Sequence, residues 1–273
     1  MFNKINALYF SGTGTTRKVV LYLVESLTAK IEEPVERINI DFSLPEARIQ
    51  SPCFTEKDLV IVGIPVYAGR VPNILLKYLN SVKGNGAQAV AVVLYGNRNF
   101  DDSLIELTDI LSNNSFKVVA AGAFIGEHSF SKILAQGRPD KDDMKEVENF
   151  ARDIYGKINR STYFHELLVS GQKPYRNYYQ PKDRLDNSFD FRVISPHTKK
   201  DVCIDCKNCA EICPVGSISY DDTSVMNGIC IKCCACIKGC PVEAKYFDNE
   251  NYKKHQHDLE KIYTERLEPE TFI

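Results

Sequence analysis

The chain has 273 residues, of which 44% are hydrophobic and 26% charged, and its formal net charge is −2 at pH 7. This composition is ordinary for a soluble globular protein, and the length suits about two domains. A charge so near zero gives no global attraction to nucleic acid or membrane surfaces. No apolar run approaches the roughly 18–20 residues of a membrane span, and Met1-Phe2-Asn3-Lys4 does not resemble a signal peptide.

The first element is a short apolar run that ends in a polar loop. Residues 5–10 read as a buried strand, and the residues from Ser11 open a helix that runs to about Lys30. A Ser/Thr/Gly loop at a helix start suits phosphate, because exposed amides and the helix dipole favour anions. An ordinary Ser/Thr helix cap is an equal alternative at this point.

This loop lacks the familiar nucleotide motifs. Arg17 stands where a dinucleotide fingerprint has its third Gly, and no Gly-Lys-Ser/Thr of a P-loop is present. The pattern S/T-x-T-G-x-T instead resembles the phosphate loop of flavodoxins. That resemblance implies FMN phosphate held by amides and hydroxyls, without a cation, at Ser11, Thr13, Gly14, Thr15 and Thr16.

Strands and helices alternate through the rest of the first half. Strands are predicted over residues 35–40, 59–64, 89–95 and 117–125, and helices over 72–82, 101–111 and 141–158. Five strands in such alternation predict an α/β fold with a doubly wound parallel sheet. Its ligand is expected beyond the carboxyl ends of the strands. The resemblance covers this half and implies a flavodoxin-like, FMN-binding domain over residues 1–160.

Two loops are the candidate contacts of the flavin ring. In flavodoxin-like proteins, the loops after the third and fourth strands hold the ring, often with a stacked aromatic. The resemblance therefore implies ring contacts at Pro65, Val66, Tyr67, Ala68, Gly69, Gly96, Asn97, Phe100 and Asp101, with Tyr67 and Phe100 as candidate stacking residues. Either aromatic alone is more often loop packing, and the glycines also have ordinary turn roles.

Basic and titratable residues lie near these loops. Flavodoxins commonly carry acidic residues near the flavin, whereas this chain has Asn97 with Arg70 and Arg98 close by. Positive charge beside the ring would stabilise anionic reduced flavin, so we hypothesise a less negative FMN potential; the alternative is that both arginines point into solvent. For His128, in the polar segment 126–140, catalysis is one interpretation and a solvated loop position the commoner one.

Residues 161–197 lose clear periodicity and read as a linker. Between Gly171 and Lys200, seven Lys or Arg face three Asp, a local charge of +4, and aromatic residues are interleaved. Such a mixture can bind nucleic acid. We expect instead that the aromatics pack on the adjacent domains and that the charge faces an acidic partner or the segment that follows.

Nine of the ten cysteines lie between Cys203 and Cys240, in two runs of the form C-x2-C-x2-C-x3-C-P. This is the bacterial spacing for two iron–sulfur clusters, in which the fourth Cys of each run ligates the other cluster. Cluster one should take Cys203, Cys206, Cys209 and Cys240, and cluster two Cys230, Cys233, Cys236 and Cys213. Both are expected to be [4Fe–4S] clusters.

Zinc sites and disulfides account for the cysteine spacing less well than iron–sulfur clusters do. Structural zinc uses C-x2-C pairs but gives no reason for triple runs followed by Pro. Disulfides need an oxidising compartment, and the cysteine distribution instead argues for a reducing cytoplasm. Cys234 fits no ligand register and reads as a packing residue near cluster two, and Cys53 as a buried or loop cysteine.

The whole chain resembles a flavodoxin–ferredoxin fusion protein of anaerobic prokaryotes. The ferredoxin-like α+β domain is placed at 198–250, and residues 251–273 are expected to form a helix packed on the protein or a mobile tail. The resemblance implies FMN and two [4Fe–4S] clusters in one polypeptide. Each cluster moves one electron and flavin takes one or two, so the union adapts one- to two-electron chemistry.

Two functions fit this combination. The first is a carrier that exchanges electrons with low-potential redox partner proteins, favoured because no acid/base pair or NAD(P) fingerprint is visible. The second is an FMN-dependent reductase of a small acceptor such as a quinone. A weaker reading treats the ferredoxin-like domain as a docking or structural module. A homodimer stays open, in which one chain's clusters would face the other's flavin.

Overall fold

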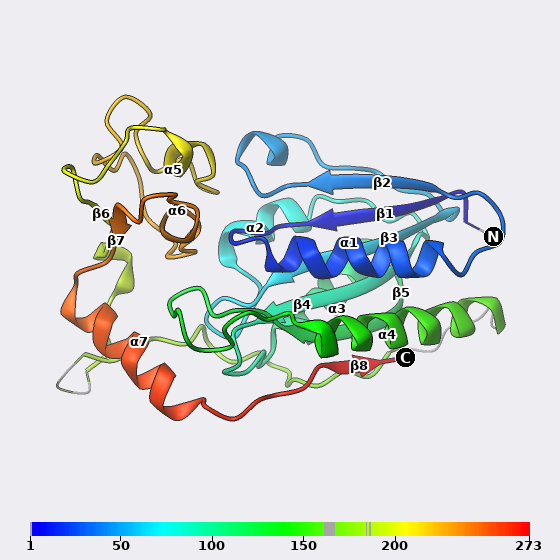
Figure 1. Cartoon of the computed structure of the whole chain (residues 1–273). Coiled ribbons are helices and arrows are strands. Elements are labelled where there is room, and N and C mark those ends of the chain that lie inside the picture. The colour runs from blue at the N-terminus through cyan, green and yellow to red at the C-terminus, as the bar shows by residue number, and fades with distance from the viewer. Residues whose placement is uncertain (1, 161–166, 184, 186) are drawn as a thin grey trace.

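The computed structural model describes residues 2–160, 167–183, 185 and 187–273 (Figure 1). Residues 161–166, 184 and 186, which belong to the predicted linker, lie outside the described part. The larger unit is built on a six-stranded sheet in the order β2-β1-β3-β4-β5-β8. Its strands are β1 (Lys4–Tyr9), β2 (Glu36–Asp41), β3 (Asp58–Pro65), β4 (Gln88–Tyr95), β5 (Lys117–Ile125) and β8 (Glu270–Phe272).

The topology confirms the expected fold class. The first five strands are parallel, and their order 2-1-3-4-5 is that of flavodoxin-like doubly wound sheets. The sixth strand, β8, comes from the C-terminus and pairs antiparallel with β5. It was not predicted from the sequence. It covers part of a sheet edge that would otherwise expose unpaired backbone groups.

Helices cover both faces of the sheet. On one face α1 (Thr15–Thr28) and α4 (Lys141–Arg160) share a core in which Val20 and Phe150 are fully or almost fully buried. On the other face α2 (Asn73–Leu79) and α3 (Ser103–Asn113) bury Leu75 and Leu107. The 3-10 turn η1 (Glu46–Arg48) follows β2. No helix in the described part of the chain has both the length and the apolar character for a membrane crossing.

The Cys-rich unit is small and internally repeated. It contains β6 (His197–Thr198), α5 (Asn208–Glu211), α6 (Ala235–Lys238) and β7 (Lys245–Tyr246), and β6 pairs antiparallel with β7. Left-handed residues recur 27 positions apart: Asp205 with Lys232, Lys207 with Cys234, and Gly216 with Glu243. The sequence repeat is therefore also a backbone repeat, and Cys234 occupies the helix-capping position of Lys207.

The chain then returns to the larger unit. The 3-10 turn η2 (Phe191–Val193) precedes the Cys-rich unit, and α7 (Glu250–Ile262) follows it. Residues 263–273, here called the C-terminal strap, run from α7 to the edge of the sheet (Figure 1). The Asn97 side-chain amide donates to the carbonyls of Tyr263 and Glu265 at 3.0 and 2.8 Å, and its oxygen accepts from the Leu267 amide at 3.2 Å.

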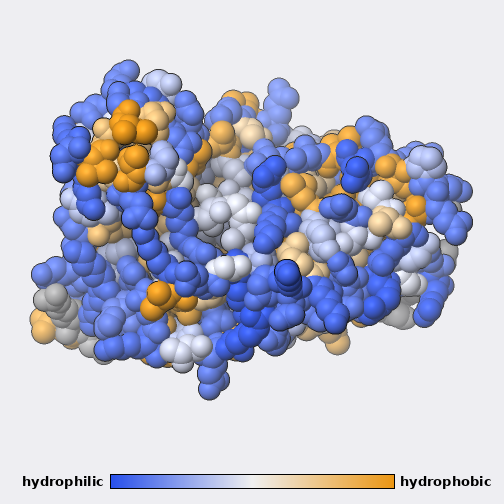
Figure 2. Space-filling model, viewed as in Figure 1, coloured by the Kyte–Doolittle hydropathy of each residue, from blue (hydrophilic) through white to orange (hydrophobic). Residues whose placement is uncertain are grey.

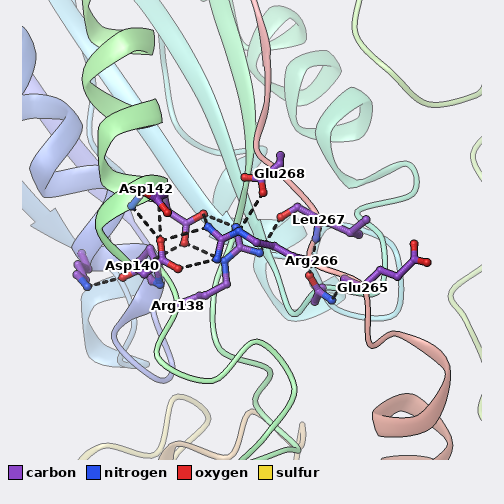
Figure 3. Close-up of polar contacts among 11 residues, drawn as sticks. Arg138, Asp140, Asp142, Glu265, Arg266, Leu267 and Glu268 are labelled. Carbon is purple, nitrogen blue, oxygen red and sulfur yellow. Dashed lines mark hydrogen bonds and ion pairs between the residues drawn. The ribbon is translucent and has the colours of Figure 1, made fainter.

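An ion-pair network fixes the middle of the strap (Figure 3). The guanidinium of Arg138 is paired with Asp143, and the two side chains are 5% and 0% exposed. Arg138 also donates to the Leu267 carbonyl at 2.7 Å. Arg266 donates to Asp140 at 2.7 Å and to Glu268 at 2.9 Å. The strap is thus held by one buried and one exposed arginine.

We predict that Arg138→Ala lowers the free energy of unfolding by about 3–5 kcal/mol, because it leaves the buried Asp143 carboxylate without its main partner. Arg152→Ala is the matched control, since the Arg152–Asp153 pair is 63% and 48% exposed and such pairs contribute about 0–1 kcal/mol. Urea unfolding followed by circular dichroism measures both. Equal losses in the two variants would contradict the role given to Arg138.

Candidate functional site

The loop between β1 and α1 forms one end of the candidate site. Gly14 adopts a left-handed conformation (φ 91°) as the residue before α1, and no side chain caps the helix there. The Ser11 hydroxyl accepts a hydrogen bond from the Arg17 amide at 3.2 Å. The amides of Thr15 and Thr16 lie in the first turn, where helix geometry provides no carbonyl partner. They remain available to an anion, as phosphate binding requires.

Two cavities meet at the carboxyl ends of the strands. The phosphate cavity is lined by Gly12, Thr13, Thr15 and Thr16, by residues 65–67 and 94–96, by residues 126–129 and by Cys233. The ring cavity is lined by residues 66–69, 95–96, 98–99 and 128–130, by Tyr179, Pro181 and Phe191, and by Ile231, Lys232, His255 and Leu259. The cavities share six residues, namely Val66, Tyr67, Tyr95, Gly96, His128 and Ser129.

This shape and chemistry fit FMN. A loop of hydroxyls and first-turn amides stands at one end, and a mainly apolar, aromatic enclosure stands at the other. The site also lies where the strand order reverses between β1 and β3, which is where doubly wound folds bind their ligands. When bound, FMN would supply a group that accepts one or two electrons.

The structure brings most of the predicted flavin residues to these cavities, but not all. Those that line a cavity are Thr13, Thr15, Thr16, Pro65, Val66, Tyr67, Ala68, Gly69 and Gly96. Phe100 is instead buried against Tyr95, with ring centroids 5.6 Å apart. Asn97 holds the strap, and Asp101 pairs with Arg98. Ser11 and Gly14 shape the loop. Direct flavin contacts remain predictions for all fourteen residues.

The two arginines near the ring loops are both neutralised. Arg70 makes two hydrogen bonds of 2.7 Å to Glu106 and lies over the rings of Tyr175 and Tyr178. The hydrogen bond to Glu106 raises the pKa of Arg70. Arg98, which lines the ring cavity, is paired with Asp101. The less negative FMN potential therefore stays a prediction. The arginine charge that would cause it is already paired with a carboxylate.

The linker covers the ring cavity. Sequence reasoning expected its aromatic residues to pack on the adjacent domains but did not place them over this cavity. The Tyr179 amide donates to the Ala68 carbonyl at 2.9 Å, and the Tyr178 hydroxyl to the Val71 carbonyl at 2.8 Å. Arg176 pairs with Asp102 at the start of α3. The positive charge of the linker thus meets acidic residues of its own chain. Its aromatic content was the available signal for a packed segment.

Two histidines from distant parts of the chain line the ring cavity. Burial lowers the pKa of His128 to about 4 and that of His255 to about 4, so both imidazoles are neutral at pH 7. The Phe130 amide donates to Nδ1 of His128 at 3.1 Å, which leaves Nε2 as the protonated nitrogen of this imidazole. His255 stacks on Tyr179 with centroids 5.7 Å apart. Neither histidine is a solvated loop residue.

The four expected ligands of cluster one line a single cavity. Cys203, Cys206, Cys209 and Cys240 surround it, together with Ile204, Lys207, Thr223 and Lys245. Cys206 is exposed, and Cys203 and Cys240 are half-buried. Cys240, from the second run, thus joins three cysteines of the first run, as crossed ligation requires.

The expected ligands of cluster two lie deeper. Cys213, Cys233 and Cys236 are buried and Cys230 is half-buried. Burial raises the pKa of the Cys236 thiol, and Cys233, Cys230 and Cys213 raise it further. Backbone amides donate to sulfur in both halves: Ser217 to Cys213 at 3.3 Å and Ala244 to Cys240 at 3.1 Å. Such hydrogen bonds tune cluster potentials.

No three His, Cys, Asp or Glu side chains among the described residues are placed to hold a single metal ion.

The remaining two cysteines have other surroundings. The Cys234 sulfur lies 3.4 Å from the Tyr252 hydroxyl, within a buried cluster that includes Phe247. Cys53 is exposed and accepts a hydrogen bond from the Asn85 side chain at 3.1 Å. Neither cysteine is a predicted iron–sulfur ligand.

The candidate cluster and flavin sites touch directly. A Cβ atom at Gly12 would lie 3.3 Å from Cβ of Cys233 and 3.4 Å from the Tyr67 hydroxyl. Cys233 also lines the phosphate cavity. Burial, followed by the neighbouring Cys233 thiolate, raises the pKa of Tyr67. Tyr67 therefore stands between the flavin loops and the cluster-two cysteines.

Comparisons with known proteins agree with part of this assignment. Residues 197–219 match the 4Fe-4S binding domain family. No curated protein matches the chain. Among solved structures, a flavodoxin from the domain Archaea aligns over 57% of this chain and 99% of its own, with 15% identity and a TM-score of 0.41.

Two further structures cover a similar share of this chain. Flavodoxin 2 from Bacillus cereus covers 56% of this chain and 99% of its own, at 18% identity and a TM-score of 0.41. An apo NADH:FMN oxidoreductase covers 59% and 91%, at 19% identity and a TM-score of 0.40. The strand order and cavities of this chain, rather than these distant similarities, carry the assignment.

We predict that Cys236→Ala halves the iron content, from roughly eight to roughly four atoms per chain, because one [4Fe–4S] cluster loses a ligand. Cys234→Ala is the control, since Cys234 contacts Tyr252 and is not an expected ligand. Iron and sulfide are measured after purification without oxygen, with bound flavin as the check of folding. Equal iron contents in the two variants would refute the ligand assignment.

We predict that Gly96→Ala weakens FMN binding roughly tenfold or more, because overpacking costs about 1–3 kcal/mol. The new Cβ would lie 2.4 Å from Cδ2 and 2.9 Å from Cα of His128, in the wall of both cavities. Gly156→Ala, in an open position of α4, serves as the control. Titration of flavin-free protein by fluorescence quenching measures both. Unchanged affinity in Gly96→Ala would place the ring elsewhere.

Proposed function

We propose that this chain is an electron-transfer protein that binds FMN and two [4Fe–4S] clusters and passes electrons between them for partner redox proteins. The observation that carries this proposal is the contact between the two candidate sites, where Cys233 lies 3.3 Å from the Cβ position of Gly12 in the phosphate loop. A cluster ligand that also lines the phosphate cavity would make the two sites parts of one path.

The order of the cofactors along this path follows from burial. The proposed cluster-one ligands include the exposed Cys206, whereas cluster two has three buried ligands and borders the flavin loops. We therefore propose the order surface, cluster one, cluster two and FMN. The eight cysteines hold the clusters, and the residues of the phosphate and ring cavities hold FMN.

Polar contacts fix the two units against each other along this path. Lys238 pairs with Glu127 and donates to the His128 carbonyl at 2.9 Å. Arg48 donates to the carbonyl of Pro214 at 2.5 Å. These contacts join the first and third of the proposed domains, whose boundaries are 1–160, 161–197, 198–250 and 251–273; the linker and the last segment would act as covers of the flavin site.

An FMN-dependent reductase is the second candidate, and the ring cavity favours it. Two neutral imidazoles, His128 and His255, line this cavity beside Arg98. Neutral imidazoles can donate hydrogen bonds to the oxygens of a small acceptor. Turnover with quinones, nitro compounds or nicotinamide nucleotides would support this candidate over the carrier.

The test is purification without oxygen, followed by flavin extraction, EPR spectroscopy and stepwise reduction with dithionite. We expect FMN and two cluster signals, and electrons that enter at the clusters should then appear on the flavin. Cys236→Ala should slow this arrival strongly, and Cys234→Ala should leave it unchanged. Protein without FMN, or flavin reduced equally fast in both variants, would contradict the proposed path.

A further inference from the structure

Large apolar side chains are exposed on the Cys-rich unit. Val202, Ile204, Tyr220 and Ile229 are 39%, 60%, 57% and 65% exposed. Figure 2 shows apolar residues gathered on the surface of this unit. Exposed apolar groups of this kind mark interaction sites when they lie together.

Part of this apolar surface lies directly over the proposed cluster one. Val202 and Ile204 flank Cys203 in the chain, and Ile204 lines the cluster-one cavity beside the exposed Cys206. Lys207, in the same cavity wall, lies over the ring of Tyr220 at 5.9 Å. We call Val202, Ile204 and Tyr220 the cluster-one patch.

The rim of the cluster-one patch carries an excess of negative charge. Residues 199–222 contain three Lys and five Asp or Glu, so the local charge is −2. Lys207 is paired with Asp205 at 2.7 Å, and Lys200 lies 3.8 Å from Asp222. The excess falls on the remaining carboxylates, which include Asp201 and Asp221.

The proposed flavin site is enclosed by protein, whereas the proposed cluster-one site reaches the surface. The ring cavity has walls from the ring loops, the linker, the Cys-rich unit and α7. A protein partner thus meets the linker and α7 before the ring, but meets Cys206 at the surface of the Cys-rich unit. Protein-to-protein exchange therefore favours cluster one.

We infer that the cluster-one patch is the docking surface for a one-electron redox protein whose contact face has an apolar centre and a basic rim. This inference rests on the proposed function. One electron leaves cluster one, which is oxidised, and reduces the partner; no bond or proton changes place. The apolar centre would hold the encounter complex together, while the acidic rim would speed association at low salt.

The experiment uses cytochrome c, a basic one-electron haem protein, as the probe. The full-length protein, loaded with its cofactors, is reduced with dithionite, and cytochrome reduction is followed by stopped flow at low and high ionic strength. Val202→Ser/Ile204→Ser should slow the reaction severalfold at both ionic strengths. Asp201→Asn/Asp221→Asn should slow it at low salt and flatten its salt dependence.

Leu168→Ser is the matched control, because Leu168 is 83% exposed and lies outside the Cys-rich unit. It should leave the rate unchanged. The wild-type protein and each variant must first show both cluster signals and reduction of their own flavin by dithionite. Absence of these signals in the wild-type protein would contradict the proposed function and not the patch. Wild-type rates in both double variants would overturn the inference. So would a change in self-association, measured by sedimentation, without any change in rate, since the patch would then join copies of this chain.

Discussion

The arrangement depends on one close approach, between Gly12 in the phosphate loop and Cys233 in the Cys-rich unit. The Cβ position at Gly12 is 3.3 Å from Cβ of Cys233 and 3.4 Å from the Tyr67 hydroxyl, so even an alanine there would require its neighbours to shift by a few tenths of an ångström. Interiors pack closely and do not absorb such displacement. The glycine therefore acts as a spacer of minimum size between the candidate cofactor sites.

Contacts far from this point keep it closed. α7 contributes His255 and Leu259 to the ring cavity, and Glu260 on the same helix accepts a hydrogen bond from Ser131 at 2.7 Å. The strap then binds α7 to the sheet through Asn97. The Asn97 side chain thus links a ring loop to the helix that closes the ring cavity. Its role is therefore to hold the ring loop and the end of α7 together.

The sequence was most informative where chemistry is set by local spacing. The parallel sheet, its helices and the grouping of Cys203, Cys206, Cys209 and Cys240 all follow from periodicity or from a repeated motif. The ring cavity was harder to predict because its walls come from distant segments, as in the hydrogen bond from the Tyr179 amide to Ala68. Phe100 illustrates the same limit: its position in a ring loop suggested stacking, but its side chain packs into the core against Tyr95.

The composition of the linker indicates that it makes contacts, but it does not identify what the linker contacts. Its basic and aromatic residues fit nucleic acid, an acidic protein or the chain itself, and composition alone does not separate these. The structure supplies the acidic surface from within, because Asp102 and Asp109 of the α3 region meet Arg176 and Lys173 of the linker. Since Asp102 is fully buried in its pair with Arg176, the linker is fixed against the start of α3, beside the ring loops. If the flavin site is closed in this way, the proposed path reaches the surface at its opposite end, at the exposed Cys206, where we propose that partner proteins exchange electrons.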